Sequence, residues 1–271
     1  MKKHWSTILL VLILVLGLSL LLYPTVADWW NSMHSSRAIA SYDAIMAEMD
    51  EEDYTHLFDA AHAYNTELNQ INFPIMYYDQ LEGYRDLLNI SGNGIMGYIE
   101  IPQINVKLPI YHGTDESVLQ LGVGHMEGTS LPIGGESTHS VLSAHRGLPS
   151  SRLFTDLDKI LVGDTFTLYV INQTLTYEVD QILIVEPADV EPLYITEGED
   201  YCTLVTCTPY GINSHRLLVR GHRVENPEAE RTVRVTSDAV QVEPVFVAPF
   251  VAAPMLLVLL VAIMIPKKRR G

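Results

Sequence analysis

Residues 165–187 read TFTLYVINQTLTYEVDQILIVEP, and their pattern decides the class of fold. β-branched and aromatic residues alternate with polar ones, and Asn172 interrupts the run, which is typical of short strands separated by a turn. Similar runs, cut by glycine, proline and asparagine, recur across residues 95–225. They predict an all-β sandwich or barrel of ~130 residues, an ordinary size for one domain. Pro102 and Pro109 interrupt the first run, so we expect short or edge strands there.

The segment before this region, residues 28–94, has a helical texture. Apolar residues recur every three or four positions in residues 36–68, which predicts one long or two shorter amphipathic helices. A further short helix is predicted from Tyr78 to Leu88, ended by the sequence SGNG. Between them, INFPIMYYD (71–79) contains Pro74 and predicts a loop. The segment is therefore expected to be a helical stem.

Two apolar runs, residues 8–27 and 245–265, flank everything described so far. A membrane-spanning helix needs about 20 apolar residues, so both runs are predicted to span a membrane. Positive charges lie on the terminal side of each run, in tails 1–7 and 266–271. By the positive-inside rule, both termini are then cytoplasmic and residues between the runs are extracellular.

The first apolar run has an alternative interpretation as a cleaved signal sequence, because Thr25 and Ala27 are small enough for a cleavage site. Trp29 and Trp30 favour an uncleaved anchor, since tryptophan is enriched at the membrane interface. Residues 226–244, before the second run, are polar and predict a linker.

The charge of the chain limits its partners. There are 33 acidic and 17 basic residues, a formal net charge of −16. Such a surface repels nucleic acid and keeps a domain soluble. It also suits partners that present amines.

The chain has two cysteines, Cys202 and Cys207. In an extended strand, residues five apart are ~16 Å apart, too far for a disulfide, and an odd spacing places them on opposite faces. We expect two free thiols in different environments.

A cysteine nucleophile needs a base or cations nearby to form its thiolate. His145 ends the apolar run SVLSA and is followed by a loop, a setting where functional residues are common, although a structural role stays open. Zinc spacings, a GxSxG elbow and a glycine-rich phosphate loop do not occur in the sequence.

Three arginines follow Cys207. Arg216 is nearest the predicted Pro-Tyr-Gly turn, on a strand that returns beside Cys207, and a guanidinium there is within reach of an oxyanion. Arg220 is ~13 Å further along that strand. We expect Arg220 and Arg223 to be surface cations.

These motifs resemble those of sortases, the membrane-anchored cysteine transpeptidases of Gram-positive bacteria. TLVTC (203–207) matches their TLxTC motif, SAHRG (143–147) resembles the segment around their histidine, and HRLLVRGHR (215–223) resembles the strand bearing their arginine. Residues 122–147 and the second hydrophobic segment are most similar to class C, the pilin-polymerising branch. The resemblance covers residues 95–224.

The resemblance implies a mainly β fold, an eight-stranded barrel with short helices. It implies Cys207 as nucleophile, His145 as general acid/base and Arg216 as the donor to the oxyanion, with no cofactor. The implied substrates are surface proteins with an LPxTG-like signal, cleaved between Thr and Gly and joined to a lysine amine of a pilin subunit. Transfer to peptidoglycan and a non-catalytic membrane-tethered assembly module are the alternatives.

Class C enzymes commonly carry a lid with an Asp-Pro-aromatic tripeptide, and no such tripeptide occurs here. The candidate lid is INFPIMYYD, in which Phe73, Tyr77 and Tyr78 are the side chains expected to plug the cleft. The alternative is a loop that only joins helices.

Overall fold

Residues 165–187 form the predicted pair of strands in the computed structural model, which describes residues 5–226. Strands β5 (Thr165–Val170) and β6 (Gln173–Val185) are antiparallel neighbours joined by a tight turn. Alternate residues of β5 are buried because successive side chains of a strand point to opposite faces. A bulge at Asp180 shifts the register of β6 against β8.

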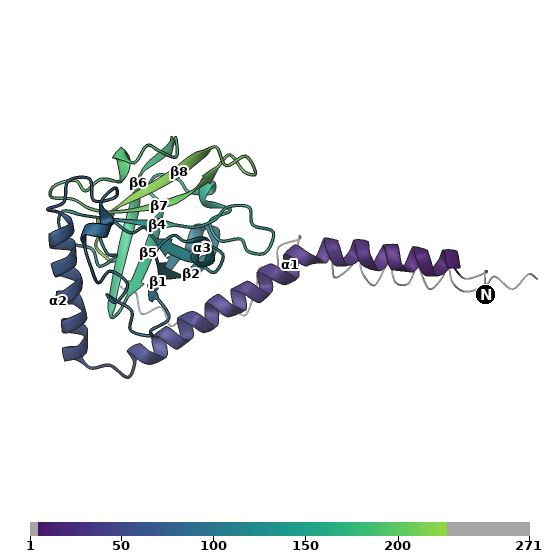
Figure 1. Ribbon diagram of the computed structural model, residues 1–271, viewed down its shortest axis with the longest axis horizontal. Coiled ribbons are helices and arrows are strands. Elements are labelled where there is room, and N and C mark those ends of the chain that lie inside the picture. Colours follow the sequence, from purple (N-terminus) through teal and green to yellow (C-terminus); the bar gives the residue numbers. More distant parts are fainter. Residues whose placement is uncertain (1–4, 227–271) are drawn as a thin grey trace, which may run out of the picture.

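The strands close into a barrel, which decides between the two predicted architectures. Their order is β1-β2-β3-β4-β7-β8-β6-β5, and β5 pairs with β1. The pairs β2–β3 and β4–β7 are parallel, and the other pairs are antiparallel. The remaining strands are β1 (Ile95–Ile101), β2 (Val106–His112), β3 (Val123–His125), β4 (Thr138–Ser143), β7 (Asp200–Thr208) and β8 (His215–Val224). Figure 1 shows the barrel with the helices on its outside.

The two prolines behave differently. Pro102 begins a 3-10 turn, Pro102–Ile104, directly after β1. Pro109 lies inside β2, which pairs with β1 on one side and with β3 on the other. The prediction of an edge strand is therefore wrong at Pro109. The pairing of β2 with β3 begins only at Ile110, so the missing N–H of Pro109 removes no hydrogen bond from that ladder.

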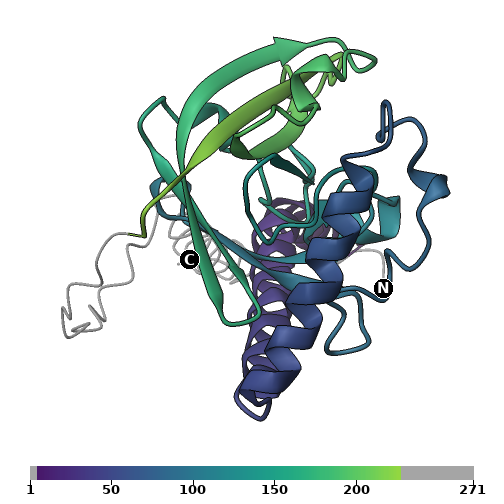
Figure 2. The same ribbon diagram turned by 90° about the vertical axis from the view of Figure 1, so that its left-hand side faces the viewer.

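Two helices precede the barrel, as predicted. Helix α1 (Trp5–Met46) joins the first apolar run and the first part of the stem in one helix. Helix α2 (Glu51–Leu68) begins at Asp50, whose side chain accepts hydrogen bonds from the backbone in a capping box. Figure 1 shows α2 and the outer end of α1 on opposite sides of the barrel, and Figure 2 shows α2 in front with α1 behind it.

Both helices are fixed to the barrel by buried contacts. The Tyr42 hydroxyl donates to the carbonyl of Met96 at 3.0 Å and accepts from the amide of Ile171 at 2.7 Å. On α2, the Asn65 side chain exchanges two hydrogen bonds with the backbone of Leu131. Apolar residues of α2 join the main core of the barrel. The stem is thus part of the folded domain.

The predicted helix from Tyr78 to Leu88 is wrong. Only a 3-10 turn, Tyr78–Gln80, forms, and turns follow it. Leu88 has a positive φ of 58° and is fully buried, and the carbonyl of Leu87 bonds to a ring nitrogen of His112. The positive φ of Leu88 is outside the right-handed helical region, and burial of its side chain holds the chain in this conformation.

Within residues 5–226, one helix is long and apolar enough to cross a membrane, and it is the part of α1 beginning at Ile8. Its most apolar window is not covered by the rest of the domain. The second apolar run (245–265), most of the predicted linker and the two terminal tails lie outside the described residues, apart from a few at their inner edges.

Candidate active site

Cys207 lies at the end of β7, and its environment differs from that of Cys202 on the same strand. Cys202 is fully buried in the main core, and burial raises the pKa of its thiol well above the usual value. Cys207 is half-buried, and both thiols are free. Val205 shares a face with Cys207 and packs in a second, smaller apolar cluster. The predicted division of the strand into two faces is confirmed.

His145 is placed beside Cys207 by the parallel pairing of β4 with β7. Ser143 pairs with Val205 at the end of this ladder. Continuing the same register by two residues along both strands places the backbone of His145 beside that of Cys207. The amide of Ala144 donates to the carbonyl of Val205, and the Thr206 hydroxyl donates to the carbonyl of Ala144 at 2.8 Å. These bonds extend the pairing past the end of β4 and set the position of the histidine backbone.

A carboxylate faces the histidine. Oε2 of Glu116, in the short helix α3 (Glu116–Leu119), lies 3.3 Å from Nε2 of His145. The contact is electrostatic, because Nε2 has no partner with hydrogen-bond alignment. Gln120 donates to the other oxygen, and this bond, followed by the charge of His145, lowers the pKa of Glu116. Sequence analysis missed Glu116, since nothing in the sequence links it to a histidine 29 positions later.

Arg216 is directly opposite Cys207 in the β7–β8 ladder, as predicted. Its guanidinium donates to two backbone carbonyls, those of Asn213 at 3.3 Å and His215 at 3.1 Å. The structure shows no carboxylate paired with it among residues 5–226. The guanidinium is thus a cation beside the thiol with donors left over.

The other two arginines are more engaged than predicted. Arg220 makes two hydrogen bonds to Asp180, at 3.0 and 2.8 Å, and lies over the ring of Tyr201. Arg223 donates to the backbone carbonyls of Thr174 and Thr176. The expectation of simple surface cations is wrong. For Arg220 the reason is the bulge in β6, where Asp180 lies next to Gln181, the residue paired with Arg220.

Arg146, next to His145, connects the segment that carries His145 to the segment that carries Cys207. Its side chain is only 9% exposed and pairs with Asp158. It also donates to the hydroxyl of Thr208, the residue after Cys207, at 3.3 Å. Cys207, His145 and Arg216 are therefore gathered at one end of the barrel, on segments that are bonded to one another.

A smaller apolar cluster lies near Cys207. It is formed by buried side chains from β4, β6, β7 and β8 and from the segments packed on them. Its members are Val141, Leu193, Val205 and Leu218, with Ile75, Met126, Leu183 and Val185 packed against them.

The predicted lid loop, residues 71–79, packs against this cluster through Ile75. Its backbone is close to Gly128, where an added Cβ would lie 2.7 Å from the carbonyl oxygen of Pro74. Phe73 has its ring edge toward Tyr194, and Phe73, Tyr77 and Tyr78 are all exposed. Ile75 is thus the residue of this loop that contacts the cluster.

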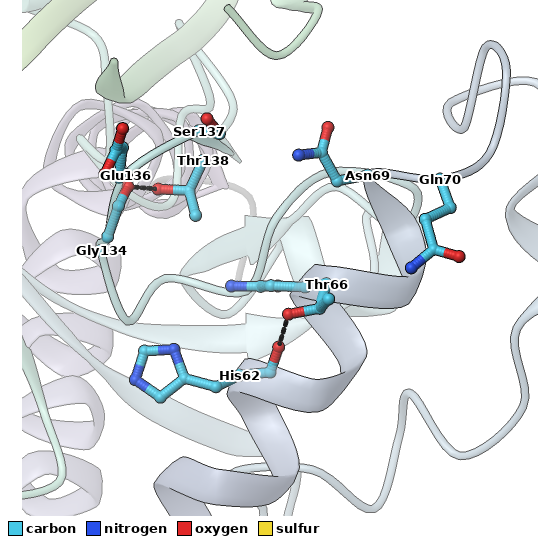
Figure 3. Close-up of a pocket in the computed structure, with 10 residues that line it drawn as sticks. His62, Thr66, Asn69, Gln70, Gly134, Glu136, Ser137 and Thr138 are labelled. Carbon is cyan, nitrogen blue, oxygen red and sulfur yellow. Dashed lines mark hydrogen bonds between the residues drawn. The ribbon is translucent and has the colours of Figure 1, made fainter. Parts of the chain in front are cut away.

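A polar pocket of about 440 Å³ lies between α2 and the loop before β4 (Figure 3). Thr138, which lines it, is level with Asp200 at the start of β7, seven residues and thus ~23 Å from Cys207 along the strand. It is therefore separate from the cysteine and histidine. Among the described residues, no group of three or more His, Cys, Asp or Glu side chains is placed to hold a metal.

The sequence and the fold both match those of a known protein family. The family model described as the sortase domain matches residues 99–224. The crystal structure of sortase C1 from Streptococcus agalactiae is 54% identical, with a TM-score of 0.65, covering 70% of this chain and 100% of that one. The chain belongs to the sortase family.

Other relatives lie in the same family. Sortase C of Clostridium perfringens, solved with the C-terminal cell wall sorting motif, is 44% identical with a TM-score of 0.62, covering 70% of this chain and all of that one. Sortase D of Bacillus subtilis is 33% identical over 131 residues, which are 47% of this chain and 63% of that protein. Sortase A of Streptococcus agalactiae is 33% identical over 117 residues, 42% and 47% of the two chains. The chain thus spans about half to two thirds of these two curated relatives.

Proposed function

We propose that this sortase is a membrane-anchored cysteine transpeptidase that cleaves an LPxTG-like sorting signal between Thr and Gly. The acyl product is transferred to a lysine amine of a pilin subunit. The observation that carries the proposal is that Cys207, His145 and Arg216 lie at one end of the barrel, near the smaller apolar cluster. The class C names of its structural relatives support pilin as the acceptor.

In the first half of the reaction, the Cys207 thiolate attacks the threonine carbonyl carbon and an oxyanion forms. Arg216, directly opposite Cys207, has guanidinium N–H groups to stabilise that charge. The C–N bond then breaks, and His145 gives a proton to the departing glycine amine. A thioester on Cys207 remains, so one difficult displacement becomes two easier ones.

In the second half, a lysine ε-amine attacks the thioester carbonyl. His145 accepts the proton of the amine, the C–S bond breaks, and Cys207 returns as a thiolate. The new bond is an isopeptide amide. The carboxylate of Glu116 lies 3.3 Å from Nε2 of His145 and helps to hold the ring toward the site.

The smaller apolar cluster suits the apolar part of the sorting signal once the loop is displaced, since its side chains include valine, leucine and methionine. Ile75 of the lid loop lies against the same side chains. We propose that a bound signal displaces this loop. Phe73, Tyr77 and Tyr78 remain candidate lid residues that would act from the loop's exposed side.

The test uses the full-length protein in detergent, an LPxTG-type peptide and a purified pilin domain. Mass spectrometry of the product identifies the new linkage. An isopeptide bond to a pilin lysine supports the proposal. Transfer only to an added peptidoglycan amine would instead support the cell-wall-anchoring function. Absence of a thioester on Cys207 would contradict both functions.

A further inference from the structure

The turn between β7 and β8, residues 209–214, exposes two large apolar side chains beside the candidate active site. Ile212 is 72% exposed and Tyr210 is 61% exposed. The turn has a defined shape, because the amides of Ile212 and Asn213 both donate to the carbonyl of Pro209 at 3.1 and 3.0 Å. The two side chains are therefore held outward by the fold.

The charge of this turn differs from that of the rest of the chain. The protein has 33 acidic residues, but residues 208–216 contain none and end in His215 and Arg216. Exposed aromatic and aliphatic side chains beside cations are typical of protein surfaces that meet a bilayer with anionic headgroups.

A series of contacts connects this turn to α1. The ring of Tyr210 covers Gly147, in the loop after His145, where an added Cβ would lie 2.9 Å from the ring. The same loop is bonded to α1: the amide of Arg152 donates to Asp28 at 2.8 Å, and Asn31 donates to the carbonyl of Ser150 at 2.8 Å.

Asp28 directly follows the apolar run 8–27, so these contacts place the turn near the point where α1 leaves the membrane. Figure 1 shows the β7–β8 turn and the loop after β4 on the side of the barrel toward which the outer part of α1 extends, whereas α2 is on the opposite side. Trp29 and Trp30, both exposed, mark the same level of the helix.

We propose that the β7–β8 turn rests on the bilayer surface through Tyr210 and Ile212, so that the catalytic end of the barrel faces the membrane. This inference rests on the proposed membrane anchoring by α1. In this orientation the turn holds the candidate active site at the level of a sorting signal that is still attached to a membrane-spanning segment.

The first experiment measures depth. Full-length protein carrying Cys207→Ala, which leaves only the buried Cys202, receives an environment-sensitive fluorophore at Ile212→Cys or at Glu197→Cys. Glu197 is the matched control, because it is exposed, lies just before β7 at the other end of the strand, and precedes Gly198, which is bonded to Ser137 of the pocket beside α2. The protein is reconstituted in vesicles of phosphatidylglycerol and phosphatidylethanolamine.

We expect a blue-shifted emission at position 212 and quenching by headgroup-level nitroxide lipids about twofold stronger than at position 197. Equal, water-like behaviour at the two positions would overturn the inference. So would a protein that does not float with the vesicles.

The second experiment separates this inference from the proposed function. Ile212→Ser is expected to keep the wild-type rate on a soluble sorting-signal peptide and to lose about fivefold on the same peptide fused to a membrane-spanning segment. An equal effect on both substrates would contradict a membrane role for Ile212. A wild-type enzyme that cleaves neither substrate would contradict the proposed function, while the fluorophore measurement would still decide the orientation.

Discussion

The adjacent strands β4 and β7 each carry a histidine or a cysteine toward either end, and the two ends behave differently. At one end, His139 and Cys202 are fully buried. His139 bonds to the carbonyl of Tyr194 and to the hydroxyl of Thr203, and Cys202 packs in the main core. At the other end, His145 and Cys207 are only partly buried, and Arg216 and Glu116 are beside them.

The difference shows that residue type alone does not make a site. Burial keeps the Cys202 thiol protonated and lowers the pKa of His139 to about 4, so neither group is ionised near neutral pH. The partly open end has a cation and a carboxylate beside the two residues. His139 and Cys202 thus lie at a sealed end of the two strands, and His145 and Cys207 lie at a working end.

The largest effect is expected from exchanging the two cysteines for alanine. Cys207→Ala removes the nucleophile and should abolish product and thioester, a loss of at least ~10³-fold. Cys202→Ala should keep activity and lower the free energy of unfolding by about 1 kcal/mol, because it leaves a small cavity in the core. Peptide cleavage and urea denaturation test the pair. Equal loss of activity in both variants would contradict the comparison.

The next effect concerns the arginines of β8. Arg216→Lys should lower kcat by about 10²-fold, since an ammonium does not reproduce the fork of a guanidinium at the oxyanion. Arg220→Lys is the matched control on the same strand, where the change weakens only the ion pair with Asp180. Steady-state kinetics on a soluble peptide measures both. Near wild-type activity of Arg216→Lys would remove Arg216 from the mechanism.

The sealed histidines predict how stability depends on pH. Burial lowers the pKa of His125 and of His139 to about 4, so the unfolded chain, with a pKa near 6.5, binds more protons than the folded one between these values. The contribution of these histidines to the free energy of unfolding is fully present above pH ~6.5. It decreases toward pH 4, by about 2–3 kcal/mol for each histidine. Urea denaturation across this range measures the slope. His139→Gln should reduce the slope, and an unchanged slope would contradict this assignment.

Glu116→Gln tests the working end more finely. The amide removes the negative charge that lies 3.3 Å from Nε2 of His145, so the ring is held less firmly toward the site and we expect kcat to fall about tenfold. Glu116→Asp, which keeps the carboxylate, should recover part of the activity in steady-state kinetics. Equal loss of activity in Glu116→Asp and Glu116→Gln would contradict a role for the carboxylate.

The smallest effect is expected at the lid loop. Ile75→Ala removes apolar contact between the loop and the smaller apolar cluster, which should raise kcat/KM for a soluble peptide about threefold by easing displacement of the loop. Met76→Ala is the matched control, because Met76 is exposed in the same loop. A decrease with Ile75→Ala would mean that Ile75 helps to bind the substrate.

Much of this protein follows from its sequence. The alternating runs after residue 95 predict the strands because side chains of a strand point to alternate faces, and the odd spacing of Cys202 and Cys207 predicts their different environments for the same reason. Local motifs also place Cys207, His145 and Arg216 at strand ends beside a turn. These are properties of short stretches of chain.

Contacts between distant segments were decided by the tertiary structure alone. Three such contacts are the closure of the barrel by β1 and β5, the pairing of Asp180 with Arg220, and the approach of Glu116 to His145. Their partners are 29 to 71 positions apart. The stretch from Tyr78 to Leu88 is not a helix, since it ends at Leu88, which is buried with a positive φ. Alternation and spacing determine which face of a strand a residue is on. Register and packing decide which residues it contacts there, and these contacts distinguish the working end of β7 from the sealed end.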